Sequence, residues 1–439
     1  MNKKKIKLLV LFIYILLTLL PLIVLMTFPM PEGRDFWRDF SIALGYVGLA
    51  MAGMQFIPTA RLQFLSDVFD MDRIYKLHHY LSMLSVGLVF LHPAILLLNN
   101  PYTLLLLNPI TAPWRAQAGI LGLAGLLLIG FTSVLRKEIK LDYNTWHIIH
   151  DLLALAIAIF AWIHIYKVNF YTAQPAMLAV WVVEAIIWGG MIVYIRLLKP
   201  LHIRKRPFKV KKIIREAADT WTMVLKPDGH PGLDFNAAQV AWININTSPF
   251  TLHRNPFSIS GSAHRKEELR FTIKNLGDFT AAIGELKGGE RVYVDGPYGN
   301  FSIDDPSAKK GLVLIAGGIG IAPIMSILST LSDQKDKRPV YLFYGNYDEK
   351  SIAFKEKIKD FQDSLHLQVT YTLEKPGKKI SAEKGFISKQ LLDKKLPKKR
   401  KALFYFICGP LPMIEAMEDN LIALDIPDKQ VRTEKYEMA

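Results

Sequence analysis

Four histidines carry the most specific chemical signal in this 439-residue sequence. His78 and His92 lie 14 positions apart in one apolar segment, and His150 and His164 lie 14 positions apart in another. Along a helix, 14 residues advance about 21 Å and return to nearly the same face. Ionisable residues are costly inside a bilayer and usually serve a function there. The two matched pairs therefore predict two metal-binding sites at different depths.

A planar haem with two axial imidazoles fits two facing helices, because haem iron takes histidine ligands. A small ion would need more ligands in a tighter shell. Ideal helix geometry favours His78 and His150 over the neighbouring His79 and His147, although a kinked helix would allow either. The predicted metal ligands are His78, His92, His150 and His164.

The histidines belong to two of six apolar segments, and a membrane span needs about 20 such residues. The segments are 8–26, 40–57, 77–98, 116–135, 147–166 and 176–198. Residues 1–200 hold only 16 of the 54 Lys and Arg residues and 10 of the 39 Asp and Glu residues, so the charge is concentrated in the remainder. We therefore predict a six-helix transmembrane domain over residues 1–200, with its first helix retained, followed by a soluble part.

The charge distribution also predicts orientation and limits the class of partner. Lys and Arg of the connecting segments follow the positive-inside rule when both termini are cytosolic, which predicts a multi-pass protein of the cell membrane with the lipid bilayer as its partner. The net charge of +15 is spread among acidic residues and does not indicate nucleic acid. The single cysteine, Cys408, excludes an intramolecular disulfide.

The soluble part reads as two β-containing domains. Short alternating strands at 221–225, 240–245 and 270–273 predict a small antiparallel barrel over residues 201–306. Continuous apolar strands at 312–316, 340–344, 368–373 and 403–407 alternate with helices, which predicts a doubly wound α/β domain over residues 307–439.

A glycine-rich turn follows the first strand of the α/β domain. It contains Gly317, Gly318 and Gly320, and Pro323 suits the first turn of the helix that follows. Glycine lets the backbone approach a phosphate, and a helix N-terminus attracts an anion. The position of this turn between a strand and a helix predicts a dinucleotide site.

Taken together, these motifs resemble the transmembrane NADPH oxidase and ferric reductase family along nearly the whole chain. The histidine segments match the haem-bearing helices of that family, and the soluble half resembles ferredoxin–NADP reductase-like modules. The resemblance implies a multi-domain membrane protein with a six-helix transmembrane haem domain, an antiparallel β-barrel FAD domain and a doubly wound α/β NAD(P)-binding domain. It implies FAD, two b-type haems, and NADPH or NADH as the electron donor.

The resemblance also implies roles for particular residues. Pro256, Phe257 and Ser258 would contact the flavin, and Lys274, Gly277, Asp278, Phe279 and Thr280 would lie at the FAD phosphates. Gly317, Gly318, Gly320 and Pro323 would hold the dinucleotide, with Cys408, Gly409 and Pro410 near the nicotinamide. Cys408 and Tyr436 would be the catalytic residues, and Tyr436 would cover the flavin.

Two departures from the family pattern bear on cofactor binding. Asn255 stands where the family usually has His or Arg. The segment Tyr344-Gly345-Asn346 lacks the Arg that many NADPH-using members carry after the second strand, which leaves Lys350 as the candidate and the choice between NADPH and NADH open.

We expect electrons to pass from cytosolic NAD(P)H through FAD and the two haems to an extracellular acceptor, with oxygen giving superoxide as the first hypothesis. Reduction of ferric or cupric chelates is the alternative, and an intramembrane quinone reductase is a further one. A nucleotide-gated transporter would need no haem. No nucleic-acid partner and no obligate protein partner is expected.

Overall fold

The computed structural model describes residues 3–28, 35–108, 110–252, 255–305, 308–377 and 381–435. The chain forms two compact units, Met1–Pro200 and Leu201–Ala439. The predicted boundary between residues 306 and 307 lies outside the described residues, and the division of the second unit into two domains stays a prediction.

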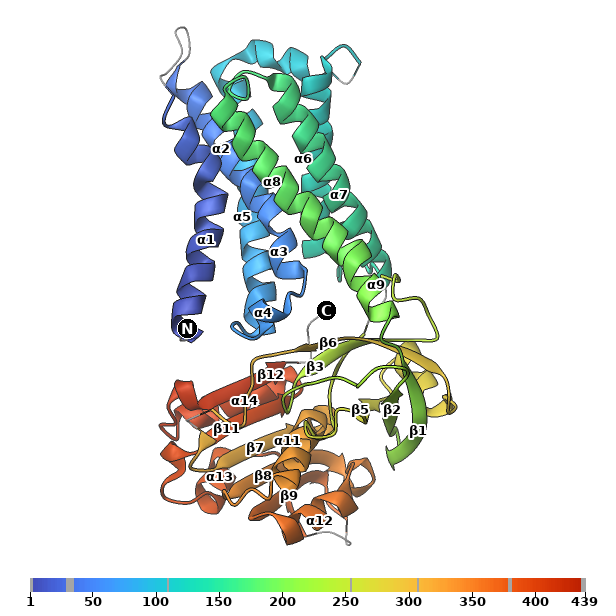
Figure 1. Cartoon of the computed structure of the whole chain (residues 1–439). Coiled ribbons are helices and arrows are strands. Elements are labelled where there is room, and N and C mark those ends of the chain that lie inside the picture. The colour runs from blue at the N-terminus through green and yellow to red at the C-terminus, as the bar shows by residue number, and fades with distance from the viewer. Residues whose placement is uncertain are drawn as a thin grey trace. The chain divides into compact units, whose positions relative to one another are not determined.

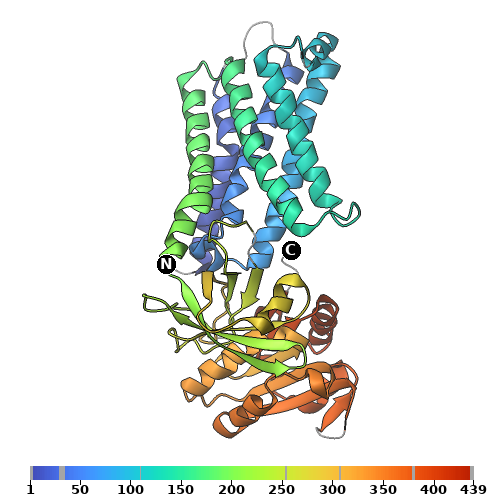
Figure 2. The same cartoon turned by 90° about the vertical axis from the view of Figure 1, so that its right-hand side faces the viewer.

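The first unit is a helical bundle (Figures 1 and 2). Among the described residues, six helices are long and apolar enough to cross a membrane, which confirms the predicted number. The helices are α1 (Lys3–Leu25), α2 (Phe36–Met54), α5 (Met71–Asn99), α6 (Trp114–Val134), α7 (Tyr143–Val168) and α8 (Pro175–Val193). Short helices α3 (Phe56–Thr59) and α4 (Gln63–Ser66) connect α2 to α5. With its six apolar helices, the protein is a multi-pass membrane protein.

Helix α2 packs along α5, and α6 packs along α7. Gly48 of α2 permits the first contact, because a Cβ there would stand only 2.9 Å from side-chain atoms of Leu88 and Val89. The Ser85 hydroxyl donates a hydrogen bond of 2.8 Å to the Gly48 carbonyl. Small residues and interhelical hydrogen bonds are the usual basis of helix packing in membranes, where the lipid supplies no hydrophobic driving force. These contacts fix α2 against α5, the helix that carries His78 and His92.

The second unit begins with a six-stranded antiparallel sheet of order β4-β3-β6-β1-β2-β5. Its strands are β1 (Phe208–Ala217), β2 (Thr220–Pro227), β3 (Val240–Ile245), β4 (Asn255–Ser258), β5 (Leu269–Lys274) and β6 (Arg291–Tyr298). Ile259, directly after β4, bridges Phe271 of β5, and this bridge joins the two ends of the sheet into the predicted barrel. The barrel interior is apolar, with Met223, Leu225 and Ile243 fully buried.

The second sheet of this unit is parallel and has the order β10-β9-β8-β7-β11-β12. Its strands are β7 (Leu312–Gly317), β8 (Val340–Asp348), β9 (Leu367–Lys375), β10 (Ala382–Lys384), β11 (Phe404–Gly409) and β12 (Val431–Lys435). The chain reverses its direction of travel across the sheet between β7 and β11, which makes that boundary the switch point where doubly wound sheets bind ligands.

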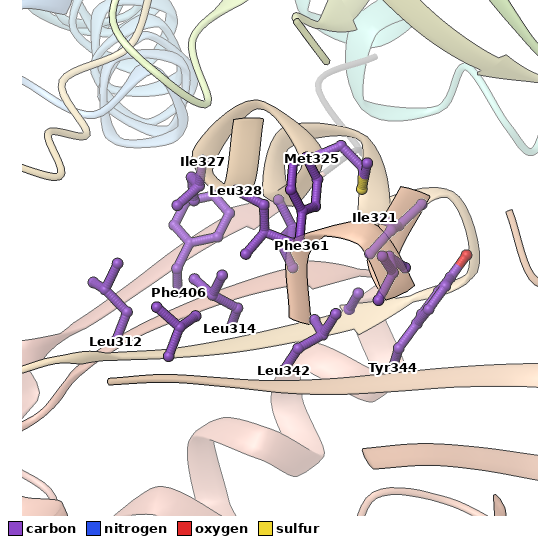
Figure 3. Close-up of a cluster of buried hydrophobic side chains, with 14 of the residues drawn as sticks. Leu312, Leu314, Ile321, Met325, Ile327, Leu328, Leu342, Tyr344, Phe361 and Phe406 are labelled. Atoms are coloured by element: carbon purple, nitrogen blue, oxygen red, sulfur yellow. The ribbon is translucent and has the colours of Figure 1, made fainter. Parts of the chain in front are cut away.

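Helices cover both faces of the parallel sheet, as the doubly wound prediction requires. Helices α11 (Ile321–Asp333) and α12 (Lys355–Ser364) cover one face, and α13 (Lys389–Lys395) and α14 (Leu411–Ile422) cover the other. Figure 3 shows Leu312, Leu314 and Leu342 of the strands packed against Met325 and Leu328 of α11. The same core includes Ala316 and Ile321, which flank the glycine-rich turn at the end of β7.

Candidate functional site

The structure brings the four histidines together as two facing pairs. His78 of α5 faces His150 of α7 with ring centroids 6.3 Å apart and ring planes at 67°. His92 and His164, farther along the same two helices, face each other at 6.5 Å and 68°. The spacing of 14 residues in each helix therefore produces two similar arrangements of paired imidazoles.

Each of these histidines also has a hydrogen-bond partner for its Nδ1 atom on a neighbouring helix. Nδ1 of His92 lies 2.9 Å from the backbone oxygen of Ser41, and Nδ1 of His164 lies 2.6 Å from that of Arg115. A carbonyl oxygen only accepts, so both Nδ1 atoms carry the proton. Nε2 is then the atom with a lone pair available to a metal, as is usual for histidine ligands oriented by a second hydrogen bond.

Side chains play the same part for the other pair. The amide nitrogen of Gln55 donates to the Tyr14 hydroxyl at 2.7 Å and to the Met51 carbonyl at 3.0 Å. Those two bonds orient the Gln55 amide so that its oxygen lies 3.2 Å from Nδ1 of His78 and accepts a hydrogen bond from it. The hydroxyl of Ser133 lies 3.3 Å from Nδ1 of His150.

Two glycines provide space for the His92–His164 pair. A Cβ on Gly45 of α2 would stand 3.0 Å from Cγ of His92, and a Cβ on Gly119 of α6 would stand 2.8 Å from Nδ1 of His164. Real Cβ atoms almost never come closer than 3.0 Å to another group. The backbone of each glycine therefore lies against one side of its histidine ring. The opposite sides of the two rings face each other.

The residues of both pairs fit haem. Metal–imidazole bonds are about 2 Å long and the bonding nitrogen lies roughly 1 Å from its ring centre, so one metal between two imidazoles sets their centroids about 6 Å apart. The observed centroid distances of 6.3 and 6.5 Å agree with this value. Within the described ranges, no group of three or more His, Cys, Asp and Glu side chains is placed to hold a metal ion. Two protein ligands suit an iron whose remaining ligands come from a macrocycle.

The two additional histidines have other surroundings. The His79 ring lies 5.4 Å from that of Tyr80. The His147 ring stacks on Tyr143 with centroids 5.9 Å apart, and its Nε2 lies 3.9 Å from the Asp151 carboxylate. The structure therefore places His78 and His150, and not these neighbours, in the facing arrangement that ideal helix geometry favoured.

In the second unit, the predicted dinucleotide residues meet at the switch point between β7 and β11. A Cβ on Gly320 would stand 2.0 Å from the carbonyl oxygen of Cys408, and one on Gly409 would stand 3.1 Å from the amide nitrogen of Gly317. Gly318 has a φ of +52°, which favours glycine. Only glycines allow these two strand ends to lie so close together, and the N-terminus of α11, with Pro323 in its first turn, opens at the same point.

The predicted flavin residues lie on neighbouring parts of the barrel. Pro256, Phe257 and Ser258 form β4 with Asn255, and Lys274 ends β5. The Phe257 ring stacks on that of Phe279 with centroids 5.9 Å apart. Gly277 precedes the short helix α10 (Asp278–Ala281), and the Thr280 hydroxyl accepts a hydrogen bond of 2.9 Å from the Gly277 amide.

Sequence reasoning missed Glu434, which connects the two sheets. The Ser258 hydroxyl donates to Oε1 of Glu434 at 3.1 Å, and the Cys408 thiol lies 3.5 Å from the Glu434 backbone oxygen. Glu434 therefore contacts one predicted flavin residue and one predicted nicotinamide residue. Tyr436, the predicted cover of the flavin, lies outside the described residues.

The helix partners Ser41, Gln55, Arg115 and Ser133 were also missed. They lie on α2 and α6 or at the end of those helices, and nothing in their own spacing marks them. The signal that could have found Gln55 and Ser133 is their polarity within apolar segments, which Glu184 shares.

Two family models match different parts of the chain. Residues 44–161 match the family model described as ferric reductase like transmembrane component, and residues 314–419 match the oxidoreductase NAD-binding domain. The reductase component of propane 2-monooxygenase from Mycolicibacterium smegmatis is 28% identical over 233 residues, which are 51% of this chain and 65% of that protein. NADH-cytochrome b5 reductase 1 from Candida glabrata is 31% identical over 187 residues, 42% of this chain and 65% of that protein.

The chain therefore spans just under two thirds of the length of these two relatives. Among solved structures, the FAD/NAD-binding domain of a nitric oxide dioxygenase from Vibrio cholerae is similar with a TM-score of 0.46 and 21% identity, covering 52% of this chain and 98% of that one.

Proposed function

We propose that this chain, which belongs to the ferric reductase and NADPH oxidase-like family of membrane oxidoreductases, transfers electrons from cytosolic NAD(P)H through FAD and two b-type haems to an acceptor on the other side of the membrane. The observation that carries the proposal is the pair of facing imidazole sites on α5 and α7. A nucleotide-gated transporter gives no reason for two such sites.

The four histidines would ligate the haems through Nε2. Ser41, Gln55, Arg115 and Ser133 would hold the rings by accepting hydrogen bonds from the Nδ1–H groups, with apolar helices keeping water away from the sites. Bound FAD takes a hydride and bound haem takes one electron at a time, which supplies redox chemistry that side chains lack.

The second unit would bind the donor and the flavin. Gly317, Gly318 and Gly320 would approach the pyrophosphate closely, and the N-terminus of α11 would attract its negative charge. Ser258, Glu434 and Cys408 would position the nicotinamide against the flavin, because they connect the β4 end of the barrel to the switch point. Tyr436 would cover the flavin as the family resemblance implies.

The orientation follows from the charged connecting segments. With both termini in the cytosol, the inner segments hold ten Lys and Arg residues before the sixth span and the outer segments hold four. We therefore place His78 and His150 on the cytosolic side, His92 and His164 on the outer side, and the protein in the cell membrane.

Oxygen is the acceptor that we propose, with superoxide as the product. If His92 and His164 both ligate a haem, they would leave no protein-side position for the acceptor, which would then be reduced from outside that site. The same geometry would serve a ferric or cupric chelate, and the name of the matching transmembrane family favours that second candidate.

The test is an optical difference spectrum of the purified full-length protein in detergent with FAD, taken without oxygen before and after NADH or NADPH is added. Reduced six-coordinate b-type bands are the expected result, and admission of oxygen should reoxidise them. Absence of these bands even with dithionite would overturn the proposal. Reoxidation by a ferric chelate but not by oxygen would replace oxygen with the chelate as acceptor.

A further inference from the structure

Glu184 is the only charged residue of α8 and is fully buried. Its Oε2 accepts a hydrogen bond of 3.0 Å from the Trp188 indole, while Oε1 has no hydrogen-bond partner among the described residues. The indole nitrogen of Trp181, one turn earlier, is also buried without a partner in the part of the chain that the structure describes. Buried polar atoms are nearly always hydrogen-bonded, so an acceptor and a donor left over on one helix face indicate a site for a polar guest.

Aromatic side chains and one glycine enclose this carboxyl group. The Trp181 and Trp188 rings lie 6.2 Å apart, and Tyr46 of α2 packs on Trp181 with centroids 5.1 Å apart. A Cβ on Gly53 of α2 would stand 1.9 Å from the Trp188 ring, so only glycine admits the ring there. The carboxyl group is therefore buried among aromatic rings, where a negative charge is costly.

The end of α2 connects the surroundings of Glu184 to the His78–His150 pair. The Trp188 ring, whose indole donates to Glu184, lies against Gly53 of α2, two residues before Gln55. The Tyr14 hydroxyl accepts from Gln55, and the Gln55 oxygen accepts from His78, as described above. Trp188 and Gln55 thus lie between the buried acid and the ring of a proposed haem ligand. The acid is near the site but does not contact its ligands.

We propose that Glu184 is a proton-binding site that balances the charge of an electron held at the His78–His150 pair, an inference that rests on the proposed function. When one electron from NAD(P)H arrives between these histidines, one proton from cytosolic water binds Oε1 of Glu184 and converts the carboxylate to the neutral acid. When the electron leaves for the His92–His164 pair, that O–H bond breaks and the proton returns to water. An added negative charge in a medium of low dielectric favours the protonated acid.

Other titratable groups near Glu184 are few among the described residues. On α1, the titratable residue near Glu184 is Tyr14. On α2 it is Tyr46, whose ring packs on Trp181. Helix α3 has no titratable residue. The turn that continues α8 carries Tyr194 and Arg196, and Arg196 pairs with Asp151 of α7. The carboxylic acids among these groups are Glu184 and Asp151, and Asp151 is already paired with Arg196.

The test is a spectroelectrochemical titration of the full-length protein in detergent at a series of pH values, with the two haems assigned by comparison with His92→Ala. The potential of the His78–His150 site should fall as pH rises, towards the roughly 59 mV per pH unit that one proton per electron requires. In Glu184→Gln that slope should flatten, while the potential of the His92–His164 site and the haem content stay unchanged. Trp188→Phe, which keeps the acid, should keep the slope.

Redox-difference infrared spectra give an independent reading on the wild-type protein. Reduction should produce the C=O stretch of a protonated carboxyl group, and Glu184→Gln should lack it. An unchanged slope in Glu184→Gln, an equal loss of slope at both haems, or no carboxyl band in the wild type would each overturn the proposal. If Glu184→Gln does not assemble, the wild-type infrared band decides. Loss of haem from the wild-type protein would instead contradict the proposed function.

Discussion

Gly119 of α6 lies against the ring of His164 on α7, so closely that a Cβ there would stand 2.8 Å from the imidazole Nδ1. The same Nδ1 donates to the Arg115 carbonyl, one turn before Gly119 on α6, at 2.6 Å. One stretch of α6 backbone thus both makes room for the ring and accepts its Nδ1–H hydrogen bond. If a Cβ were added at position 119, the ring would have to move, and that movement would break the hydrogen bond.

Gly119→Ala should therefore displace His164 and empty the His92–His164 site. We expect about half of the haem per protein to be lost, because one of two bis-histidine sites fails. Haem content by absorbance after purification measures this. Gly122→Ala on the same helix is the matched control, since its Cβ would meet its nearest neighbour at an ordinary 3.7 Å. Equal haem loss in both variants would show that the helix and not the ring is disturbed.

The ligand assignment itself is tested by replacing adjacent histidines. His78→Ala should lose one haem and leave the other reducible by dithionite, because its ring faces His150 at 6.3 Å. His79→Ala should keep both haems, because that ring lies beside Tyr80 instead. The measurement is the haem-to-protein ratio together with the amplitude of the reduced bands.

The reverse result would mean that a kink exchanges the two ligands when haem is bound. His150→Ala against His147→Ala repeats the comparison on α7, where His147 stacks on Tyr143.

The histidine pairs show how far the sequence alone can predict a site. The 14-residue spacing needs only helix geometry, so the facing arrangement on α5 and α7 follows from the positions of the histidines in the sequence. Their Nδ1 partners do not, because Ser41 and Arg115 contribute only backbone oxygens, which have no sequence signature. Gln55 serves through an amide whose orientation depends on a contact with Tyr14, 41 residues away.

The soluble half divides in a similar way. Apolar runs predicted β7, β8, β9 and β11, since both faces of a parallel sheet are buried. Strand β12 was missed because Val431–Lys435 is mostly polar, yet it pairs with β11 at the sheet edge. Glu434 was missed with it, because only the fold brings residue 434 beside Ser258.

Glu434 is expected to matter for hydride transfer and not for haem binding. It accepts from the Ser258 hydroxyl at 3.1 Å, and its backbone oxygen lies 3.5 Å from the Cys408 sulfur. Glu434→Gln keeps the shape but removes the charge that strengthens the first bond. We expect flavin reduction by NADH to slow by roughly 10–100-fold, in line with the loss of about 1.5–3 kcal/mol from a hydrogen bond to a charged group.

Stopped-flow absorbance of the flavin, with haem content as a second reading, measures this effect. Glu415→Gln on the exposed face of α14 is the control for a lost carboxylate. Unchanged flavin reduction in Glu434→Gln would mean that this contact only joins the two sheets.

We expect the choice between NADH and NADPH to depend on the end of β8. Asp348 is the last residue of that strand, and its Oδ1 accepts from the amide of Ser351 at 3.0 Å and from its hydroxyl at 2.8 Å. These hydrogen bonds hold the pKa of Asp348 below its usual range, so the carboxylate is charged at neutral pH. An acidic side chain near this position accepts a bond from the ribose 2′-hydroxyl of NADH and repels the 2′-phosphate of NADPH.

The wild-type protein should therefore prefer NADH. Asp348→Asn keeps the oxygen that accepts from Ser351 and removes the charge, so kcat/KM for NADPH should rise about tenfold, or about 1.4 kcal/mol of transition-state free energy. Initial rates of flavin reduction with each nucleotide give the ratio. Asp360→Asn on the exposed face of α12 makes the same charge change away from β8 and should leave the ratio as it is. A wild-type preference for NADPH, or an equal shift in both variants, would show that Lys350 and the overall charge, and not Asp348, govern the choice.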